Sequence, residues 1–110
     1  MSRFAAVGEL RTRAILEAPD DFVDDAGALV RAWQPLASVW LKISPRRGAE
    51  IFVAGEQESV VTFDVVMRWR LDVASPMRFR IGARALSIRA AFDPDGRRRF
   101  LVCVCEEFAA

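Results

Sequence analysis

The chain has 110 residues, a net charge of +1 and no histidine, so it can form one domain with its own core but lacks the usual catalytic base. Hydrophobic residues make up 53%, and with glycine the apolar share exceeds the roughly 45–50% of typical soluble domains. No apolar run approaches the roughly 18 residues of a membrane-spanning helix. The excess is therefore expected in a subunit interface or in a strongly apolar core.

The first elements are predicted as a strand followed by a loop. Residues 8–16 are predicted to form a strand, and Pro19 ends it. Residues 20–27 are rich in Asp and close on a glycine, which is typical of a surface loop. Residues 29–33 predict a short strand or an ordered approach to the next strand, and Gln34-Pro35 is expected to break it.

A second main strand is predicted over residues 36–44. Val39, Leu41 and Ile43 share one face, and Pro45 ends the strand because proline cannot donate to the ladder. Residues 46–58 contain two glycines and no sustained alternation, so they are predicted to be a long loop with at most one helical turn. A connection of this length is unusual in a compact domain and is often functional.

The stretch 60–71 carries the strongest strand signal. Its odd-numbered residues are all apolar and its even-numbered residues are mixed, so one face of the strand is continuously apolar. At twelve residues it is about twice the usual strand length, so we expect it to bend around a barrel or to cross a sandwich.

The remainder is predicted to form hairpins. Residues 72–76 form a turn, and strands over 77–81 and 84–92 are joined through Gly82-Ala83. Asp93-Pro94-Asp95-Gly96 fits a type I turn that leads into a last strand over 98–107.

Both faces of that last strand are apolar, so it is expected to be buried on two sides. Cys103 and Cys105 lie two residues apart on it, a poor fit to disulfide geometry, so both are predicted to be buried thiols. The predicted fold is all-β: one domain over residues 1–110, a small β-barrel of about six to seven antiparallel strands with a long loop between the second and third main strands.

Charge is unevenly distributed. Residues 1–25 carry net −3 and residues 68–99 carry net +6. This polarity favours head-to-tail contact between copies, or a basic face turned toward nucleic acid. The candidate interface or DNA-facing residues are Arg78, Arg80, Arg84, Arg97, Arg98 and Arg99.

A stand-alone nucleic-acid-binding β-barrel is the alternative function. By strand parity Phe79 points away from Arg78 and Arg80, which argues against base stacking and leaves non-specific contact with duplex DNA. No phosphate-binding glycine loop is present, and the paired carboxylates lie in predicted loops or at the C-terminal end. We therefore expect no enzyme, no metal site and no cofactor.

Short motifs follow one another in order along residues 8–107: Gly8-x-Leu10-Arg11-x-Arg13-x-Ile15, Asp25-x-Gly27, Trp33, Val39-Trp40-x-x-Ile43-x-Pro45-x-x-Gly48-x-Glu50, Thr62 with Arg68, Pro76-Met77-Arg78 with Ile88, Asp95-Gly96-Arg97, and Cys105-x-Glu107. In order and spacing they resemble the head–tail adaptor proteins, also called head-closure or stopper proteins, of tailed bacteriophages, prophages and gene transfer agents.

The resemblance implies a structural virion protein that assembles as a ring below the portal and its adaptor, retains packaged double-stranded DNA and joins head to tail. Its implied partners are copies of itself, the portal-proximal adaptor, a tail or tail-terminator protein, and DNA through non-specific contact, with no membrane. Such a protein would be made in the bacterial cytoplasm and end in the virion. A neighbouring neck or tail-completion subunit is the other role left open. The long loop could then project into the ring lumen, with candidate residues Arg46, Arg47, Gly48, Glu50, Phe52, Gly55 and Glu56.

Overall fold

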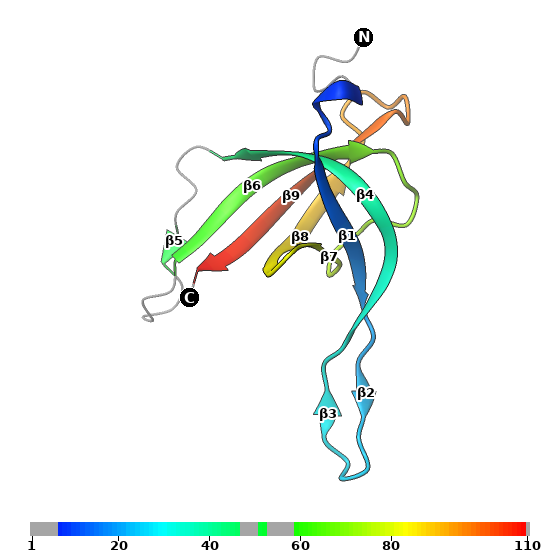
Figure 1. Ribbon diagram of the computed structural model, residues 1–110, viewed down its shortest axis with the longest axis vertical. Coiled ribbons are helices and arrows are strands. Elements are labelled where there is room, and N and C mark those ends of the chain that lie inside the picture. Colours follow the sequence, from blue (N-terminus) through cyan, green and yellow to red (C-terminus); the bar gives the residue numbers. More distant parts are fainter. Residues whose placement is uncertain (1–6, 47–50, 53–58, 110) are drawn as a thin grey trace.

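The computed structural model describes residues 7–46, 51–52 and 59–109, and the regular structure of this part of the chain is antiparallel strands apart from one 3-10 turn (Figure 1). Six of them form a ring in the order β4-β1-β7-β8-β9-β6, which β4–β6 pairing closes. Their bounds are β1 Thr12–Pro19, β4 Trp33–Pro45, β6 Ser59–Arg68, β7 Arg78–Ile81, β8 Arg84–Phe92 and β9 Phe100–Ala109. The prediction of an all-β antiparallel fold is confirmed. Within these residues no helix has the length and apolar character needed to cross a membrane.

Strand β4 closes the ring because it changes partner along its length. Residues from Trp33 to Leu41 pair with β1, and residues from Leu41 to Pro45 pair with β6. The predicted break at Gln34-Pro35 is wrong, since β4 runs through both residues. Pro35 lies at a register shift in the β1–β4 ladder, and such bulges are where a strand tolerates proline.

The interior is filled by residues that alternate inward from all six strands. Leu16, Leu41, Val65, Phe79 and Cys103 are among its fully buried members. A second, smaller cluster lies apart from this interior and contains Leu10, Val66, Phe100 and Val102. Val66 pairs with Val102, so Leu10 ties the N-terminal segment to β6 and β9. The prediction that β9 is buried on both faces is confirmed.

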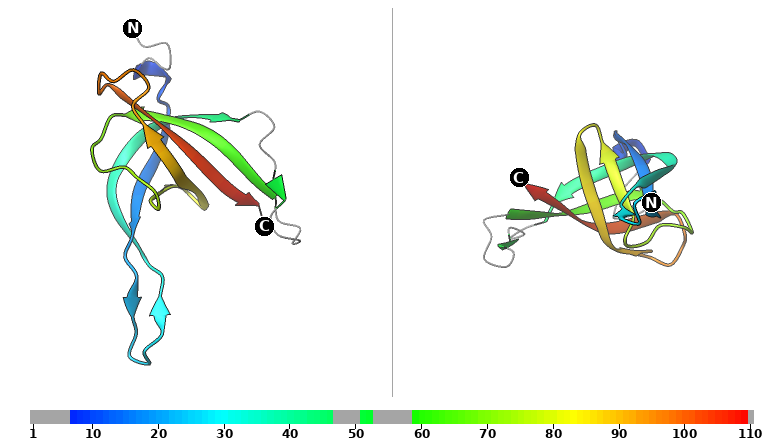
Figure 2. Two further views of the ribbon diagram at one scale, coloured as in Figure 1. Left: turned by 180° about the vertical axis from the view of Figure 1, so that it is seen from behind. Right: turned by 90° about the horizontal axis from the view of Figure 1, so that it is seen from below.

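The predicted loop over residues 20–27 is wrong, because a two-stranded ribbon occupies this region. Strands β2 (Phe22–Val23) and β3 (Leu29–Val30) pair with each other and extend β1 and β4 beyond the ring (Figures 1 and 2). We call residues 20–32 the arm. It projects from one end of a molecule whose longest extent is 53 Å.

Several predicted boundaries also need correction. A single 3-10 turn, η1 (Val7–Glu9), precedes β1, so the first strand begins at Thr12 and not at residue 8. Strand β6 ends at Arg68, and Leu71 is 85% exposed instead of lying on an apolar strand face. The connection between β8 and β9 spans residues 93–99 and is longer than a four-residue turn.

The predicted long connection after β4 lies largely outside the described residues. Its described part includes β5 (Ile51–Phe52), which pairs with Val60 and Ser59 of β6. Residues 51–52 therefore form a strand, and not part of a loop or helical turn as the sequence predicts.

Replacing Phe79 with Ala should lower the free energy of unfolding by about 3–5 kcal/mol, because the ring is fully buried in the interior cluster. Leu71→Ala removes a similar side chain from the surface and should cost less than about 0.5 kcal/mol. Denaturant unfolding followed by tryptophan fluorescence measures both values. Similar losses for the two variants would contradict this assignment of the core.

The two thiols should resist modification in the folded protein. Both are fully buried, and burial raises the pKa of Cys103 from 9.0 to about 12 and raises the pKa of Cys105 as well. The folded state thus favours the neutral thiols; their contribution to stability is complete below pH 9 and is lost as the pH rises toward about 12. A thiol reagent at pH 8 should label neither cysteine until denaturant is added. Rapid labelling without denaturant would show that the strands carrying them open readily.

Candidate functional site

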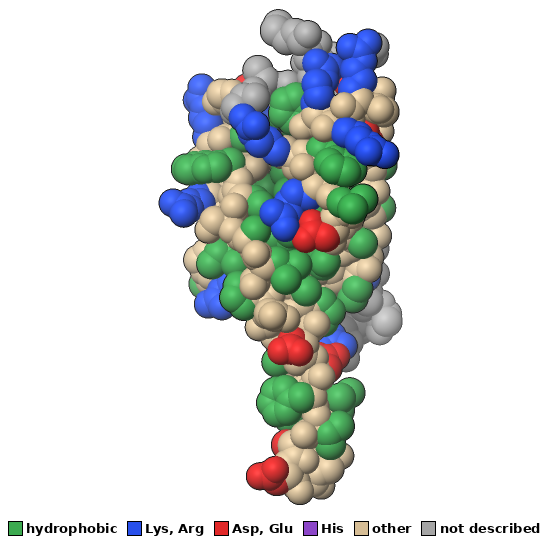
Figure 3. Space-filling view, turned by 90° about the vertical axis from the view of Figure 1, so that its right-hand side faces the viewer, with side chains coloured by type: hydrophobic (Ala, Val, Ile, Leu, Met, Phe, Trp, Pro, Cys, Tyr) green, Lys and Arg blue, Asp and Glu red, His purple; other side chains and the backbone are tan. Residues whose placement is uncertain are grey.

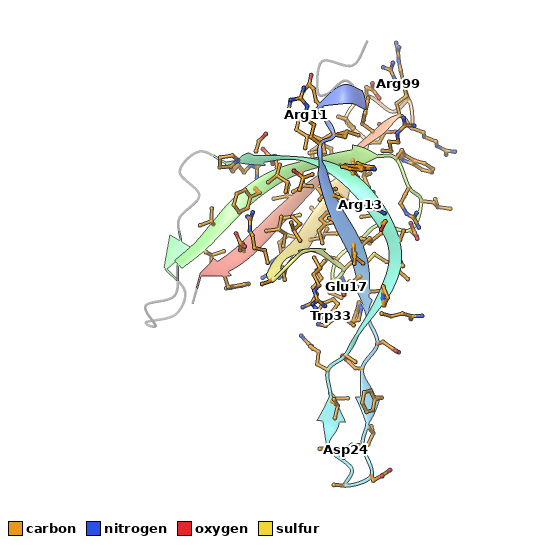
Figure 4. The ribbon with its side chains drawn as sticks, in the orientation of Figure 1. Arg11, Arg13, Glu17, Asp24, Trp33 and Arg99 are labelled. Atoms are coloured by element: carbon orange, nitrogen blue, oxygen red, sulfur yellow. The ribbon has the colours of Figure 1, made fainter. Side chains whose placement is uncertain are left out.

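The features suited to binding lie at two opposite ends of the molecule. Lys and Arg side chains gather at the end that carries η1 and the β8–β9 loop, and the arm forms the other end with acidic and hydrophobic side chains (Figure 3). Arg11 and Arg99 mark the first end and Asp24 the second (Figure 4). The molecule is therefore polar along its longest axis.

The tip of the arm is held by Asp24. Its backbone N–H donates to the Ala28 carbonyl at 2.9 Å, and the Gly27 N–H donates to the Asp24 carbonyl at 3.0 Å. Its carboxylate accepts the N–H groups of Ala26 at 3.0 Å and Ala28 at 2.9 Å. Gly27 has φ +83°, a conformation that favours glycine. The tip is thus a pre-organised turn.

The strands of the arm expose apolar side chains on both faces. Phe22 pairs with Val30 on one face, and Val23 pairs with Leu29 on the other. Phe22, Val23 and Leu29 are 52%, 65% and 72% exposed. The same segment carries four Asp against Arg31, a net charge of −3. The arm therefore offers a surface that is both apolar and acidic.

The root of the arm is fixed by a largely buried ion pair. Glu17 is only 5% exposed, and Arg78 Nε donates to its Oε1 at 2.7 Å. The Arg78 guanidinium also stacks on the Trp33 ring, 4.0 Å from its centroid. These three residues come from β1, β7 and β4, so the contact ties the arm-bearing strands to the β7–β8 hairpin.

On the outer face of the β1–β4 sheet, toward the basic end, arginines surround an exposed tryptophan. Trp40 is 51% exposed, and Arg13 lies opposite it in the β1–β4 ladder with its guanidinium 5.9 Å from the ring centroid. A hollow of about 400 Å³ is lined by Leu10, Arg11, Trp40 and Arg68. A second, of about 210 Å³, is lined by Ser38, Val39, Trp40, Met67, Arg68 and Arg70.

We call the residues Arg11, Arg13, Trp40, Arg68 and Arg70 the Trp40 surface. Arg70 makes two hydrogen bonds to Asp72, at 2.9 and 2.8 Å, which lower the pKa of that carboxyl group. The four arginines and Asp72 together leave this surface strongly basic.

The β8–β9 loop presents Arg97, Arg98 and Arg99 near the same end. The Asp93 carboxylate accepts backbone N–H groups from Asp95, Gly96 and Arg98 at 2.8–3.3 Å. Asp95 accepts the Arg97 N–H and a hydrogen bond from the Arg99 side chain, both at 3.0 Å, and these lower its pKa. Two aspartates thus shape the loop, and Arg98 lies over Trp69, 5.3 Å from its ring centroid.

The six arginines predicted as an interface do not form one patch. Arg78 and Arg80 lie beside Glu17, at 2.7 and 3.9 Å. Arg84 makes two 2.9 Å hydrogen bonds to Glu107, which lower the pKa of Glu107. The three loop arginines lie beyond the far end of β8 from Arg84. Sequence proximity therefore grouped side chains that the fold separates.

The candidate lumen residues are mostly outside the described part of the chain. Arg47, Gly48, Glu50, Gly55 and Glu56 fall there, and only the backbone of Phe52 is described, in β5. Arg46 donates its N–H to the Thr62 carbonyl at 2.8 Å, and its Nε lies 3.4 Å from Asp64.

The Trp40 surface and the binding character of the arm were missed by sequence reasoning. Arg11 and Arg13 were counted with the acidic N-terminal region, although the fold carries them away from the arm's aspartates. The alternation of residues along the strand does predict that Trp40 lies on the other face from Val39 and Leu41, and this is the one sequence signal for an exposed tryptophan. In the described residues no group of three or more metal-ligating side chains comes together.

The chain is similar to proteins that belong to virus-like particles. The family model described as phage head completion protein matches residues 6–107. A chain from a structure titled virion of native gene transfer agent particle is 28% identical with a TM-score of 0.74, over 91% of this chain and 96% of that one. The solution structure of protein SF1141 from Shigella flexneri 2a is 22% identical with a TM-score of 0.66, over 94% and 96%, and supports the fold. No curated protein matches the chain.

Replacing Glu17 with Gln should lower the free energy of unfolding by about 2–3 kcal/mol, because the partly buried Arg78 loses its charged acceptor. Glu106→Gln is the matched control: its partner Arg89 is 53% exposed, so this change should cost less than about 1 kcal/mol. Thermal and denaturant unfolding of the two variants provide the comparison. If Glu17→Gln proved as mild as its control, the ion pair would not secure the arm root.

Proposed function

This chain belongs to the family of phage head completion proteins, and from that premise we propose that it forms a ring below the portal and its adaptor, retains packaged DNA and joins the head to the tail. As a member of this family it is a structural protein of the virion. The chain from the gene transfer agent virion, similar along nearly the whole length, supports assembly with other virion proteins.

The main support for a ring is that each subunit has two different surfaces, one acidic and apolar and one basic. An acidic, apolar arm extends from one end of the 53 Å molecule, and a basic surface with an exposed tryptophan lies on the sheet, toward the other end. Two different patches suit heterologous contacts, in which each copy touches the next, and such contacts close into a ring when the rotation between copies allows it. The high apolar content of the chain is consistent with surfaces that assembly covers.

DNA retention is proposed to depend on a narrow passage and on many weak contacts. The paired arginines Arg78 and Arg84 offer little free charge to phosphates. Within the described residues no carboxylate lies within 4.0 Å of the Arg97 or Arg98 side chain, so the β8–β9 loop is the better source of phosphate contacts. Repeated around a ring, even weak contacts add up.

We assign the lumen role to the segment between β4 and β6, residues 46–58. It leaves the ring next to Arg46 and returns through β5 and β6. The portal-proximal adaptor and a tail or tail-terminator protein would occupy the two rims of the ring.

Replacing residues 47–57 with a short Gly-Ser linker should leave a folded protein, because β6 keeps its pairing with β9 and β4 without β5. Particles made with this variant should lose packaged DNA or lack tails. Encapsidated DNA and electron microscopy of purified particles measure the two outcomes.

The matched control is Arg84→Gln, which leaves the segment intact and removes charge from an arginine already paired with Glu107. Particles from this control should retain normal DNA content. Normal infectious or transducing particles from the linker variant would count decisively against a lumen role for residues 46–58.

A further inference from the structure

We propose that the arm of one copy docks on the Trp40 surface of the next copy, so that this contact joins successive subunits head to tail. The inference rests on the proposed ring and names the surfaces that build it. Its basis is the match in charge and apolar character between the arm and the arginine-rich surface away from it (Figures 3 and 4).

The arm leaves both of its faces uncovered within the subunit. A two-stranded ribbon alone is only marginally stable in water, because neither face is covered. Here both faces carry apolar side chains: exposed Phe22 beside the partly exposed Val30 on one face, and exposed Val23 and Leu29 on the other. Its ends are nevertheless well ordered, by Asp24 at the tip and by the Glu17–Arg78 contact at the root. A pre-organised element of this kind loses little conformational freedom when it binds.

The Trp40 surface has the complementary chemistry. Trp40 provides an exposed aromatic face beside two hollows, against which an apolar side of the ribbon can pack. Aromatic and Arg side chains are the groups most enriched at the energetic centres of protein interfaces. Arg11, Arg13 and Arg68 stand around the ring, where they can meet the carboxylates of an arm.

Charge and geometry favour a second copy over other occupants. The arm carries net −3, and the Trp40 surface carries four arginines against Asp72. The arm points away from the six-stranded sheet that carries Trp40, so an arm cannot reach its own chain's Trp40 surface. Duplex DNA would satisfy the arginines but would leave the apolar pairs of the arm exposed, whereas one arm–surface contact covers both.

Site-directed cross-linking in assembled particles tests the contact. The native Cys103 and Cys105 are fully buried, so introduced cysteines provide the accessible thiols. Ala26→Cys at the arm tip and Ser38→Cys beside Trp40 keep every charge of the proposed interface. With a short bismaleimide, the double variant A26C/S38C should give a ladder of cross-linked multimers of this chain. The matched control A26C/A90C, with its second thiol at the exposed position 90 of β8, should give none.

Charge reversal provides a second readout in the same particles. Arg68→Glu and Asp25→Arg should each lower particle yield, by roughly tenfold when a like-charge contact repeats around a ring. The two changes combined should restore part of that yield. Arg31→Glu, which makes the arm more acidic, should cause no loss.

Three outcomes would each contradict the proposed contact between the arm and the Trp40 surface. If the arm thiol cross-links to a different virion protein while this chain is incorporated, the arm docks elsewhere and the proposed function survives. If Trp40→Ala abolishes salt-dependent binding of duplex DNA by the purified chain while the A26C/S38C ladder is absent, the surface binds phosphates. If the folded chain is absent from particles altogether, the proposed function fails together with this interface.

Discussion

The change of partner along β4 is the constraint on which the rest of the structure depends. At Leu41 this strand leaves β1 and joins β6, and that transfer closes a six-stranded sheet that would otherwise have two open edges. Closure encloses the interior cluster and aims the start of β4 away from the ring. Because β1 ends beside that start, the two strands continue outward together as the arm. The protruding element is thus a direct consequence of how the sheet closes.

The register shift between Leu16 and Glu17 connects the closed sheet to the root of the arm. On one side of the shift Leu16 is buried in the interior, and on the other Glu17 is buried against Arg78. Consecutive buried side chains are unusual for a strand, whose neighbours normally alternate between faces. The shift therefore turns one residue toward the core and the next toward a contact that ties β1 to β7. The arm is anchored by the same irregularity that accommodates Pro35.

Electrostatics in this protein depend on which arginines have partners. Arg70, Arg78, Arg84 and Arg99 are each within 3.0 Å of a carboxylate, and they act mainly within the subunit. Arg11, Arg13 and Arg68 surround Trp40 instead, and Arg97 and Arg98 stand on the loop between β8 and β9. The net charge is only +1, but the acidic residues of the arm and these arginines lie in different parts of the molecule. Such separation suits assembly of identical subunits in one direction.

The sequence by itself determined the six strands of the closed sheet, the inward side of β4 and the two-sided burial of β9, because alternation of apolar residues reports directly which side of a strand faces a core. It also supplied the ordered motifs from which the family could be predicted. It did not reveal that the aspartate-rich segment after Pro19 is an arm, that Leu71 is exposed, or that Arg13 and Arg68 flank Trp40. Those features were decided by tertiary structure, since pairing between strands distant in the chain sets their register and neighbours, and no local pattern encodes which strand pairs with which.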